Sequence, residues 1–135
     1  MRLVLDTNVL VAAFISEGFC HDLLEHCFLN HEVVLSNRIL QELDETLQKK
    51  FRFSKEESDQ TLDLLRSRAL LVEPEPLPRE VCRDSDDDWI LAAGTAGGCQ
   101  MIVSGDKDLL DIGEFEGLRN VRPSEFQELE NEPNE

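Results

Sequence analysis

The stretch that decides the fold is residues 1–14, which read MRLVLDTNVLVAAF. A short apolar run ends at Asp6, and a second apolar run begins at Val9. A short apolar run before a polar break is typical of a strand buried on both faces, as in a parallel sheet, and the second run predicts the helix that follows. Asp6 would then lie at the carboxyl end of a central strand, the edge where open α/β sheets carry their chemistry. The alternative is that Asp6, Thr7 or Asn8 only caps the helix.

The composition suits one soluble domain with a real core, since the chain has 135 residues and a hydrophobic fraction of 41%. No apolar run approaches the ~20 residues that span a bilayer, and a strand already occupies the N-terminus, so we expect neither a signal peptide nor a membrane association. The four cysteines are scattered without a CxxC pair. This pattern favours reduced thiols in a cytoplasmic protein over a structural zinc site.

The net charge of −16, from 13 basic and 29 acidic residues, argues against tight nonspecific binding to nucleic acid. It fits a carboxylate-rich metal site, a basic protein partner or simple solubility. Part of the acidic excess lies in residues 125–135, which we expect to extend into solvent. The domain organisation predicted from these features is a single domain over residues 1–126 and an acidic C-terminal tail over residues 127–135.

Apolar runs and helical patterns alternate along the chain. Strands are predicted at residues 2–5, 32–36, 70–72, 101–103 and 119–123. Helices are predicted at residues 9–14, 20–29, 37–50, 54–68, 85–97 and from residue 124. This alternation predicts a three-layer α/β/α fold, with a central parallel sheet of four to five strands and helices on both faces.

Acidic residues recur at equivalent places in this arrangement. Asp6 follows the first strand, and Asp106 follows the fourth after a Ser-Gly turn. Asp87 and Asp88 lie in the first turn of the helix that leads to the fourth strand, and Glu42 lies in the helix after the second. In a parallel sheet all of these positions can face one edge. Between the two neighbours we favour Asp87, whose i+3 and i+4 partners are Ile90 and Leu91. Asp88, whose partners at the same spacings are Leu91 and Ala92, is close behind.

Carboxylates cannot crowd together without compensation, because like charges raise one another's pKa and a buried charge is costly unless it is paired. The nearest bases in the sequence are Arg83 and Lys107. A hard divalent cation would resolve the conflict, and Mg²⁺ or Mn²⁺ prefers carboxylate and water oxygens. Such an ion can activate water and clamp the oxygens of a phosphodiester.

Each acid also has a plainer explanation. Ser85 and Asp88 have the spacing of a capping box, and acids in a first helical turn favour the helix dipole. Glu42 alone suits a solvated helix face, and Asp106 and Asp108 suit a turn. The joint pattern is more specific than any of its members.

Four stretches in register resemble the PIN-domain family, nearest to its branch of proposed toxin components of prokaryotic toxin–antitoxin systems, relatives of the VapC-type ribonucleases. They are residues 3–10 (LVLDTNVL), Ser36-x-x-Ile39-x-x-Glu42-Leu43, residues 83–92 (RDSDDDWILA) and residues 103–110 (VSGDKDLL). The match in order and spacing covers about residues 1 to 126. The branch usually has proline where this chain has Ser85, a change that should alter only the loop into the helix.

The resemblance implies a Rossmann-like PIN fold, an acidic Mg²⁺ or Mn²⁺ site and hydrolysis of phosphodiester bonds, usually in RNA. Carried over by position, the catalytic acids are Asp6, Glu42, Asp87 and Asp106, and the metal ligands are Asp6, Asp87, Asp88 and Asp106. The residues that would support the site by hydrogen bonds are Thr7, Asn8 and Ser104. The partners implied are an RNA substrate, a cognate antitoxin protein and a second copy of the chain in a homodimer.

One dense basic stretch, residues 49–55, offers a candidate for RNA contact through Lys49, Lys50 and Arg52. Its alternative is a helix C-terminus whose two phenylalanines pack inward.

Two other functions compete with the nuclease. An aspartyl phosphatase would use Asp6 as a covalent nucleophile, but such enzymes usually carry a second Asp where this chain has Asn8. A PIN-fold binding protein with little turnover would agree with the acidic charge, although it would not need the full set of acids.

Overall fold

The centre of the sheet is β1 (Arg2–Leu5), in which Leu3, Val4 and Leu5 have no exposed surface. The computed structural model describes residues 1–132 of the chain. In it, β1 pairs in parallel with β2 (Glu32–Ser36) on one side and with β4 (Met101–Val103) on the other. A strand with two parallel neighbours is covered on both faces by crossover helices, which explains its unbroken apolar run.

The strand order is β3-β2-β1-β4-β6-β5, with β3 (Leu70–Val72) and β6 (Leu118–Val121) joining the parallel set. The sixth strand, β5 (Glu114–Phe115), pairs antiparallel with β6 at the edge. The parallel sheet is therefore confirmed, but the predicted count of four to five strands is low by one. Two residues are too few to show the alternation from which a strand is recognised.

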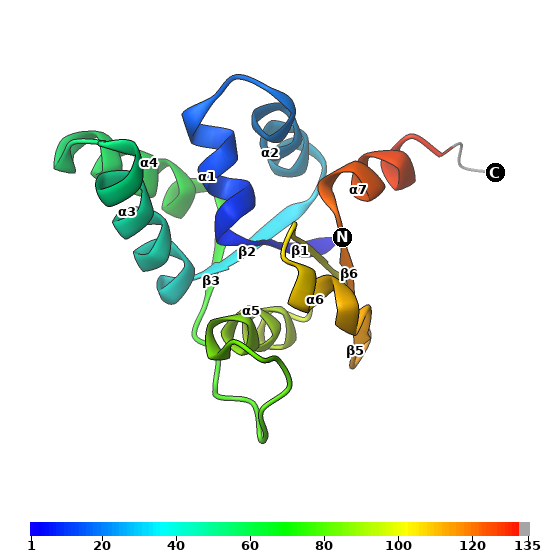
Figure 1. Ribbon diagram of the computed structural model, residues 1–135. Coiled ribbons are helices and arrows are strands. Elements are labelled where there is room, and N and C mark those ends of the chain that lie inside the picture. Colours follow the sequence, from blue (N-terminus) through cyan, green and yellow to red (C-terminus); the bar gives the residue numbers. More distant parts are fainter. Residues whose placement is uncertain (133–135) are drawn as a thin grey trace.

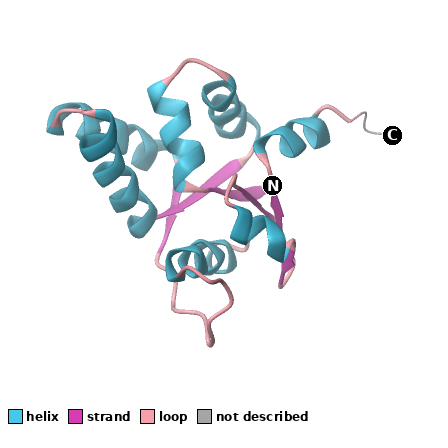
Figure 2. Cartoon of the chain, viewed as in Figure 1, coloured by secondary structure: helices cyan, strands magenta, loops and turns pink. Residues whose placement is uncertain are grey.

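Helices cover both faces of the sheet, as the alternation predicted (Figures 1 and 2). On one side lie α1 (Thr7–Ile15), α2 (Phe19–Asn30), α3 (Asn37–Phe51), α4 (Lys55–Arg68) and α7 (Pro123–Glu130). On the other side α5 (Ser85–Ala96) packs across the central strands, and α6 (Lys107–Ile112) follows β4. Within residues 1–132, no helix has both the length and the apolar character needed to cross a membrane.

Side-chain caps fix where several helices begin. Ser36 accepts a hydrogen bond from the Ile39 N–H at 3.2 Å and starts α3 directly at the end of β2. A reciprocal capping box of Ser54 and Glu57 starts α4. The interpretation of Ser85 and Asp88 as a capping box is wrong. Asp84 is the N-cap of α5, and its side chain accepts a hydrogen bond from the Asp86 N–H at 2.9 Å.

The C-terminal segment is more ordered than its composition suggested. Residues 125–130 do not extend into solvent, because α7 continues to Glu130 and packs against α2. Phe126 is 1% exposed in the core and holds this helix in place. The predicted boundary between residues 126 and 127 thus falls within α7, and residues 133–135 of the predicted tail lie outside the described residues.

Candidate functional site

Asp6 lies where β1 ends and α1 begins, and both of its carboxylate oxygens are held. The Thr7 N–H donates to Oδ1 at 2.7 Å, and the Ser104 hydroxyl donates to Oδ2 at 2.7 Å. Asp6 is therefore the N-cap of α1, as the capping alternative had it, and also part of a larger polar cluster. Burial raises the pKa of Asp6 although these two hydrogen bonds act to lower it, and the nearby Asp106 raises it further.

Ser104 joins Asp6 to the end of β4. Its hydroxyl is fully buried and, while donating to Asp6, accepts a hydrogen bond from the Asp106 N–H at 2.9 Å. Asp106 is the N-cap of α6 and accepts from the Asp108 N–H at 2.8 Å. The backbone N–H of Asp6 also donates to the Val103 carbonyl at 3.0 Å. The ends of the two central strands are thus fixed to each other around these carboxylates.

Asp87 reaches the same place from the first turn of α5. Its carboxylate oxygen Oδ2 is buried and has no hydrogen-bond partner among residues 1–132, and the residue is only 6% exposed. Burial is the largest cause that raises the pKa of Asp87 to about 7, and the charges of Asp106 and Asp6 come next. Carboxylate oxygens of Asp87, Asp106 and Asp108 lie within 4.8 Å of one another. We call Asp6, Asp87, Asp106 and Asp108 the acidic cluster.

The side chain of Asp88 makes different contacts from that of Asp87. Its two oxygens accept hydrogen bonds from the backbone N–H groups of Val81, at 3.1 Å, and Cys82, at 2.6 Å. Asp88 therefore anchors the loop before α5. The structure brings Asp87, and not Asp88, to the acidic cluster. Asp108 takes part although its position had suggested only a turn, and its spacing of two residues from Asp106 was the available signal.

Glu42, which belongs to α3, lies next to the acidic cluster. The Thr7 hydroxyl donates to its carboxylate at 3.2 Å. Burial raises the pKa of Glu42, the charges of Asp86 and Asp6 raise it further, and the hydrogen bond from Thr7 and the charge of Arg38 oppose the rise. Thr7 thus links the end of β1 to Glu42.

Arg38 is the cation that the sequence analysis missed. Its guanidinium lies 3.0 Å from Asp86 and 5.0 Å from the centre of the Trp89 ring. It precedes Glu42 by one helical turn, so the two share a face of α3, and this spacing was the available signal. Arg38, rather than Arg83 or Lys107, is the base whose charge acts on Glu42.

Four other predicted site residues make no side-chain hydrogen bond or ion pair with the acidic cluster among the described residues. Asn8 is exposed on the first turn of α1. The C-terminal end of α3 carries the other three, Lys49, Lys50 and Arg52, and all three are exposed. Lys49 lies seven positions after Glu42, which is about 10 Å along a helix. The basic stretch therefore lies on the surface, about three helical turns from the N-terminal start of α3 and about two turns from Glu42.

The acidic cluster fits a hard divalent cation by the chemistry of its donors. Each neighbouring charge that acts on Asp87 is negative and raises its pKa, and one of its oxygens is buried without a partner in the described chain. Mg²⁺ and Mn²⁺ take carboxylate oxygens as ligands and would balance this charge. The residues whose oxygens are spaced to hold such an ion are Asp87, Asp106 and Asp108. Asp6 adjoins them through the hydroxyl of Ser104.

A parallel α/β sheet with carboxylates gathered at the carboxyl edge of its central strands defines the class of this protein. The family model described as PIN domain matches residues 2–108, and the chain belongs to the PIN-domain family. Among curated proteins, none is significantly similar to this sequence.

Solved structures share the fold at low sequence identity. One is the crystal structure of VapBC2 from Rickettsia felis bound to a DNA fragment from their promoter. That match has a TM-score of 0.63 and 18% identity, and it covers 90% of this chain and 98% of that chain. Another is the structure of VapBC-1 from nontypeable Haemophilus influenzae. Its TM-score is 0.64 with 17% identity, over 92% of this chain and 99% of that chain.

Proposed function

We propose that the protein is a Mg²⁺- or Mn²⁺-dependent ribonuclease and the toxin component of a prokaryotic toxin–antitoxin pair. The observation that carries the proposal is the unpartnered buried oxygen of Asp87 beside Asp6 and Asp106. A fold alone does not need such an arrangement, because three crowded carboxylates destabilise the folded state unless a cation balances them. Membership of the PIN-domain family supports the same reading.

The residues divide the work by position. Asp87, Asp106 and Asp108, with Asp6 beside them, would hold the ion, which when bound would supply positive charge to the phosphodiester and make a bound water more acidic. Glu42, whose pKa is raised by burial, accepts the proton of the attacking water as the P–O bond breaks. The hydroxyls of Ser104 and Thr7 fix the carboxylates of Asp6 and Glu42 by hydrogen bonds.

The proposed partners follow from the similar structures and from the charge. The two similar structures named above are VapBC assemblies, which supports an antitoxin protein and a homodimer as partners of this chain. The net charge of −16 favours a basic segment in a protein partner. A protein of this kind would act on RNA in the cytoplasm.

The phosphatase alternative lacks the second carboxyl group that such enzymes usually use. The contacts of Asp6 do not separate the two functions, because each of its oxygens accepts one hydrogen bond and keeps a second lone pair. The position two residues on is Asn8, which is exposed and offers no carboxyl group as an acid. The alternative of a PIN-fold binding protein agrees with the acidic net charge. It predicts little or no hydrolysis of RNA.

The test is cleavage of a mixed RNA pool by the purified full chain, with Mn²⁺ and with EDTA. We expect cleavage that requires the metal and is lost in Asp87→Asn, while Asp59→Asn, a matched change at an exposed acid on α4, cleaves like the wild type. Cleavage that survives EDTA, or that Asp87→Asn retains, would eliminate the metal-nuclease mechanism. Metal binding without cleavage would favour the binding protein.

A further inference from the structure

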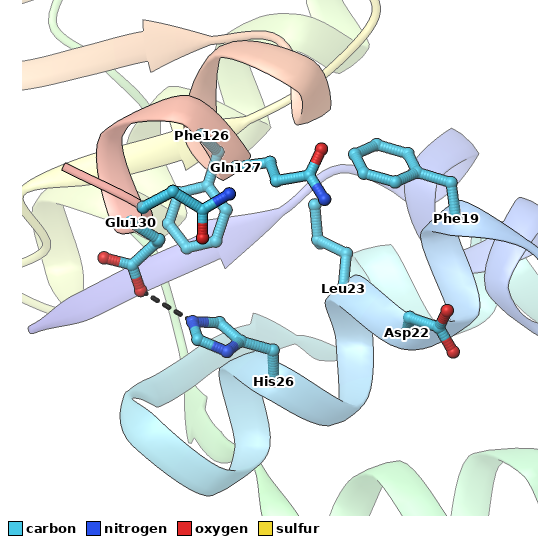
Figure 3. Close-up of a pocket in the computed structure, with 8 residues that line it drawn as sticks. Phe19, Asp22, Leu23, His26, Phe126, Gln127 and Glu130 are labelled. Atoms are coloured by element: carbon cyan, nitrogen blue, oxygen red, sulfur yellow. Dashed lines mark hydrogen bonds and ion pairs between the residues drawn. The ribbon is translucent and has the colours of Figure 1, made fainter.

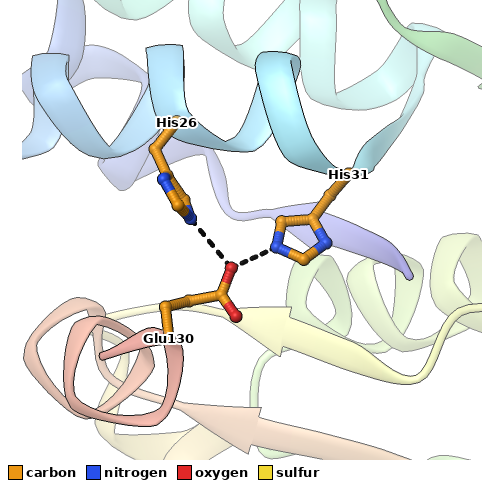
Figure 4. Close-up of side chains that lie close together, drawn as sticks. All are labelled: His26, His31 and Glu130. Carbon is orange, nitrogen blue, oxygen red and sulfur yellow. Dashed lines mark hydrogen bonds and ion pairs between the residues drawn. The ribbon is translucent and has the colours of Figure 1, made fainter. Parts of the chain in front are cut away.

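Two of the three histidines of the chain converge on one carboxylate far from the acidic cluster (Figure 4). His26 lies on α2, His31 directly follows that helix, and Glu130 ends α7, about a hundred positions later in the sequence. One donor atom from each of the three residues lies within 4.8 Å of the others. We call these residues the histidine cluster.

The rings present their Nε2 atoms to the same oxygen. His26 Nε2 lies 2.8 Å from Glu130 Oε1, and His31 Nε2 contacts that same oxygen. Zinc–nitrogen and zinc–oxygen bonds of about 2.0–2.1 Å place tetrahedral ligands about 3.3 Å apart. To admit an ion, the carboxylate would therefore have to withdraw from His26 by about half an ångström and from His31, which it contacts more closely, by more than that.

Contacts at the far sides of both rings hold them in this orientation. The Asn30 side-chain amide lies 3.2 Å from His26 Nδ1, and the amino group of Met1 lies 3.2 Å from His31 Nδ1. The Phe126 ring packs edge-on against both imidazoles, with centroids 6.3 and 5.9 Å away. A histidine that binds a metal through Nε2 carries its proton on Nδ1 and donates it to an acceptor. Metal binding therefore requires the Asn30 amide to turn its oxygen towards His26 Nδ1, and the Met1 amino group to lose a proton or move away from His31 Nδ1.

A pocket between α2 and α7 gives access to the histidine cluster (Figure 3). Its volume is about 230 Å³, and its lining includes His26 and Glu130 together with Phe19, Leu23 and Phe126. His26 is 44% exposed at its side chain, whereas His31 is 11% exposed. An ion can therefore enter from the pocket, and water can occupy the coordination positions that the protein leaves open.

We propose that His26, His31 and Glu130 form a second metal site, which binds Zn²⁺ or a similar transition-metal ion and ties α7 to α2. Two imidazoles and one carboxylate suit Zn²⁺, Ni²⁺ or Co²⁺, whereas the acidic cluster suits ions that prefer oxygen. The two sites differ in donor chemistry and lie on different elements. This proposal therefore does not depend on the nuclease proposal.

The test is titration of the metal-free full chain with Zn²⁺ in excess Mg²⁺, followed by calorimetry, and with Co²⁺, followed by visible absorption. We expect one Zn²⁺ per chain and a Co²⁺ spectrum of nitrogen and oxygen ligands. His26→Gln and His31→Gln should each lower the affinity at least about 10-fold, a loss that even outer partners of a metal can cause. Asp6→Asn should leave this binding unchanged.

The matched control is His21→Gln, because His21 lies on the same helix but pairs only with Glu25 in the described structure. Glu130→Gln separates the two roles of the carboxylate, since a glutamine can still accept hydrogen bonds from both rings but is a poor zinc ligand. Equal affinity in His21→Gln and His31→Gln, or full Zn²⁺ affinity in Glu130→Gln, would overturn the proposal. So would a Co²⁺–thiolate charge-transfer band, which would place the ion on a cysteine.

Discussion

Asp87 and Asp88 are neighbours of one residue type with opposite environments. Asp88 gives both oxygens to backbone N–H groups, whereas Asp87 keeps a buried oxygen without a partner in residues 1–132. Successive residues on a helix point about 100° apart, so one turns to the loop and the other to the strand ends. This rotation decides which of the two carboxylates is available to a metal.

The first prediction concerns Asp6→Asn and Asp106→Asn. Each change keeps the side-chain shape but removes a charge that would hold the ion, so cleavage of RNA should fall at least about 100-fold, since metal stabilisation of a transition state amounts to several kcal/mol. Without metal, the free energy of unfolding should rise, because repulsion within the acidic cluster is relieved. RNase assays and urea unfolding in EDTA measure the two effects.

If Asp6 and Asp106 only cap their helices, a different result is expected for these variants. Asp→Asn at an N-cap is nearly neutral for stability, and it should be neutral for activity as well. If Asp106→Asn matches the wild type in both assays, Asp106 acts only as the cap of α6.

The second prediction concerns the pH dependence of the metal-free protein. Burial and the neighbouring carboxylates raise the pKa of Asp87 to about 7 in the folded state, whereas the unfolded chain releases this proton near pH 4. Between these values the folded state holds the extra proton, so the free energy of unfolding falls as pH rises and levels off above about pH 7. Urea unfolding in EDTA at about pH 5 and about pH 8 should show a larger loss in wild type than in Asp87→Asn. Equal losses would remove Asp87 as the source.

The polar residues show how far the sequence alone could predict the site. Asp6, Asp87 and Asp106 follow from their places at the ends of elements, because a parallel sheet brings such places together. The bridging contacts of Ser104 depend on side-chain rotamers, which the sequence pattern does not specify. The histidine cluster was beyond reach, because its contacts join residues about a hundred positions apart without a local motif.

At the scale of the elements, α5 lies close against the sheet at its C-terminal end. A Cβ atom added at Gly97 would lie 2.7 Å from Val34 Cγ1, a branched side chain with no exposed surface on β2. Neither Val34 nor the strand can withdraw easily, so the absence of a side chain at Gly97 allows this close approach.

The third prediction is that Gly97→Ala lowers the free energy of unfolding by about 1–3 kcal/mol, the usual cost of overpacking a core. Gly105→Ala is the matched control, because nothing lies within 4 Å of the added Cβ and the backbone there is not in the left-handed region. That change should not lower the free energy of unfolding, because a glycine whose backbone suits alanine can be replaced without strain. Equal urea midpoints for the two variants would show that the helix shifts to make room.

The fourth prediction concerns the basic end of α3. If Lys49, Lys50 and Arg52 grip phosphates, reversing the three charges should weaken RNA cleavage and flatten its dependence on salt, because fewer counterions are released on binding. Salt titrations of the cleavage rate measure this, with circular dichroism as the check on folding. Unchanged activity and salt slope would limit these residues to ending the helix and facing solvent.

The long elements were more predictable than the short ones, since the six-residue helix α6 was not predicted. Long helices such as α3 and α4 were clear because apolar periodicity and caps agree there. The edge strand β5 is too short to carry a pattern, and its pairing depends on the tertiary neighbour β6. The last turn of α7 was missed since its charge suggested solvent, while packing by Phe126 decided the outcome.

For the whole molecule, the fifth prediction is that Mg²⁺ raises the melting temperature through the acidic cluster. An ion that binds only the folded state at 100 times its dissociation constant adds about 2.7 kcal/mol of stability. Mg²⁺ is chosen because it prefers oxygen ligands to the imidazoles of the histidine cluster. Thermal melts of wild type and Asp6→Asn over a Mg²⁺ series should diverge. If both respond alike, the acidic cluster does not hold the ion.

The strand order has a consequence for synthesis of the chain on the ribosome. β1 is made first, but its partner β4 and the Ser104 hydroxyl follow only after a further 98 positions. Until then one edge of β1 has no partner from β4, and Asp6 has neither that hydrogen bond nor the neighbouring Asp106. A fragment released before residue 101 therefore carries an open strand edge that other chains can join, and it lacks the assembled carboxylates. The acidic cluster can therefore assemble only in chains whose translation has passed β4.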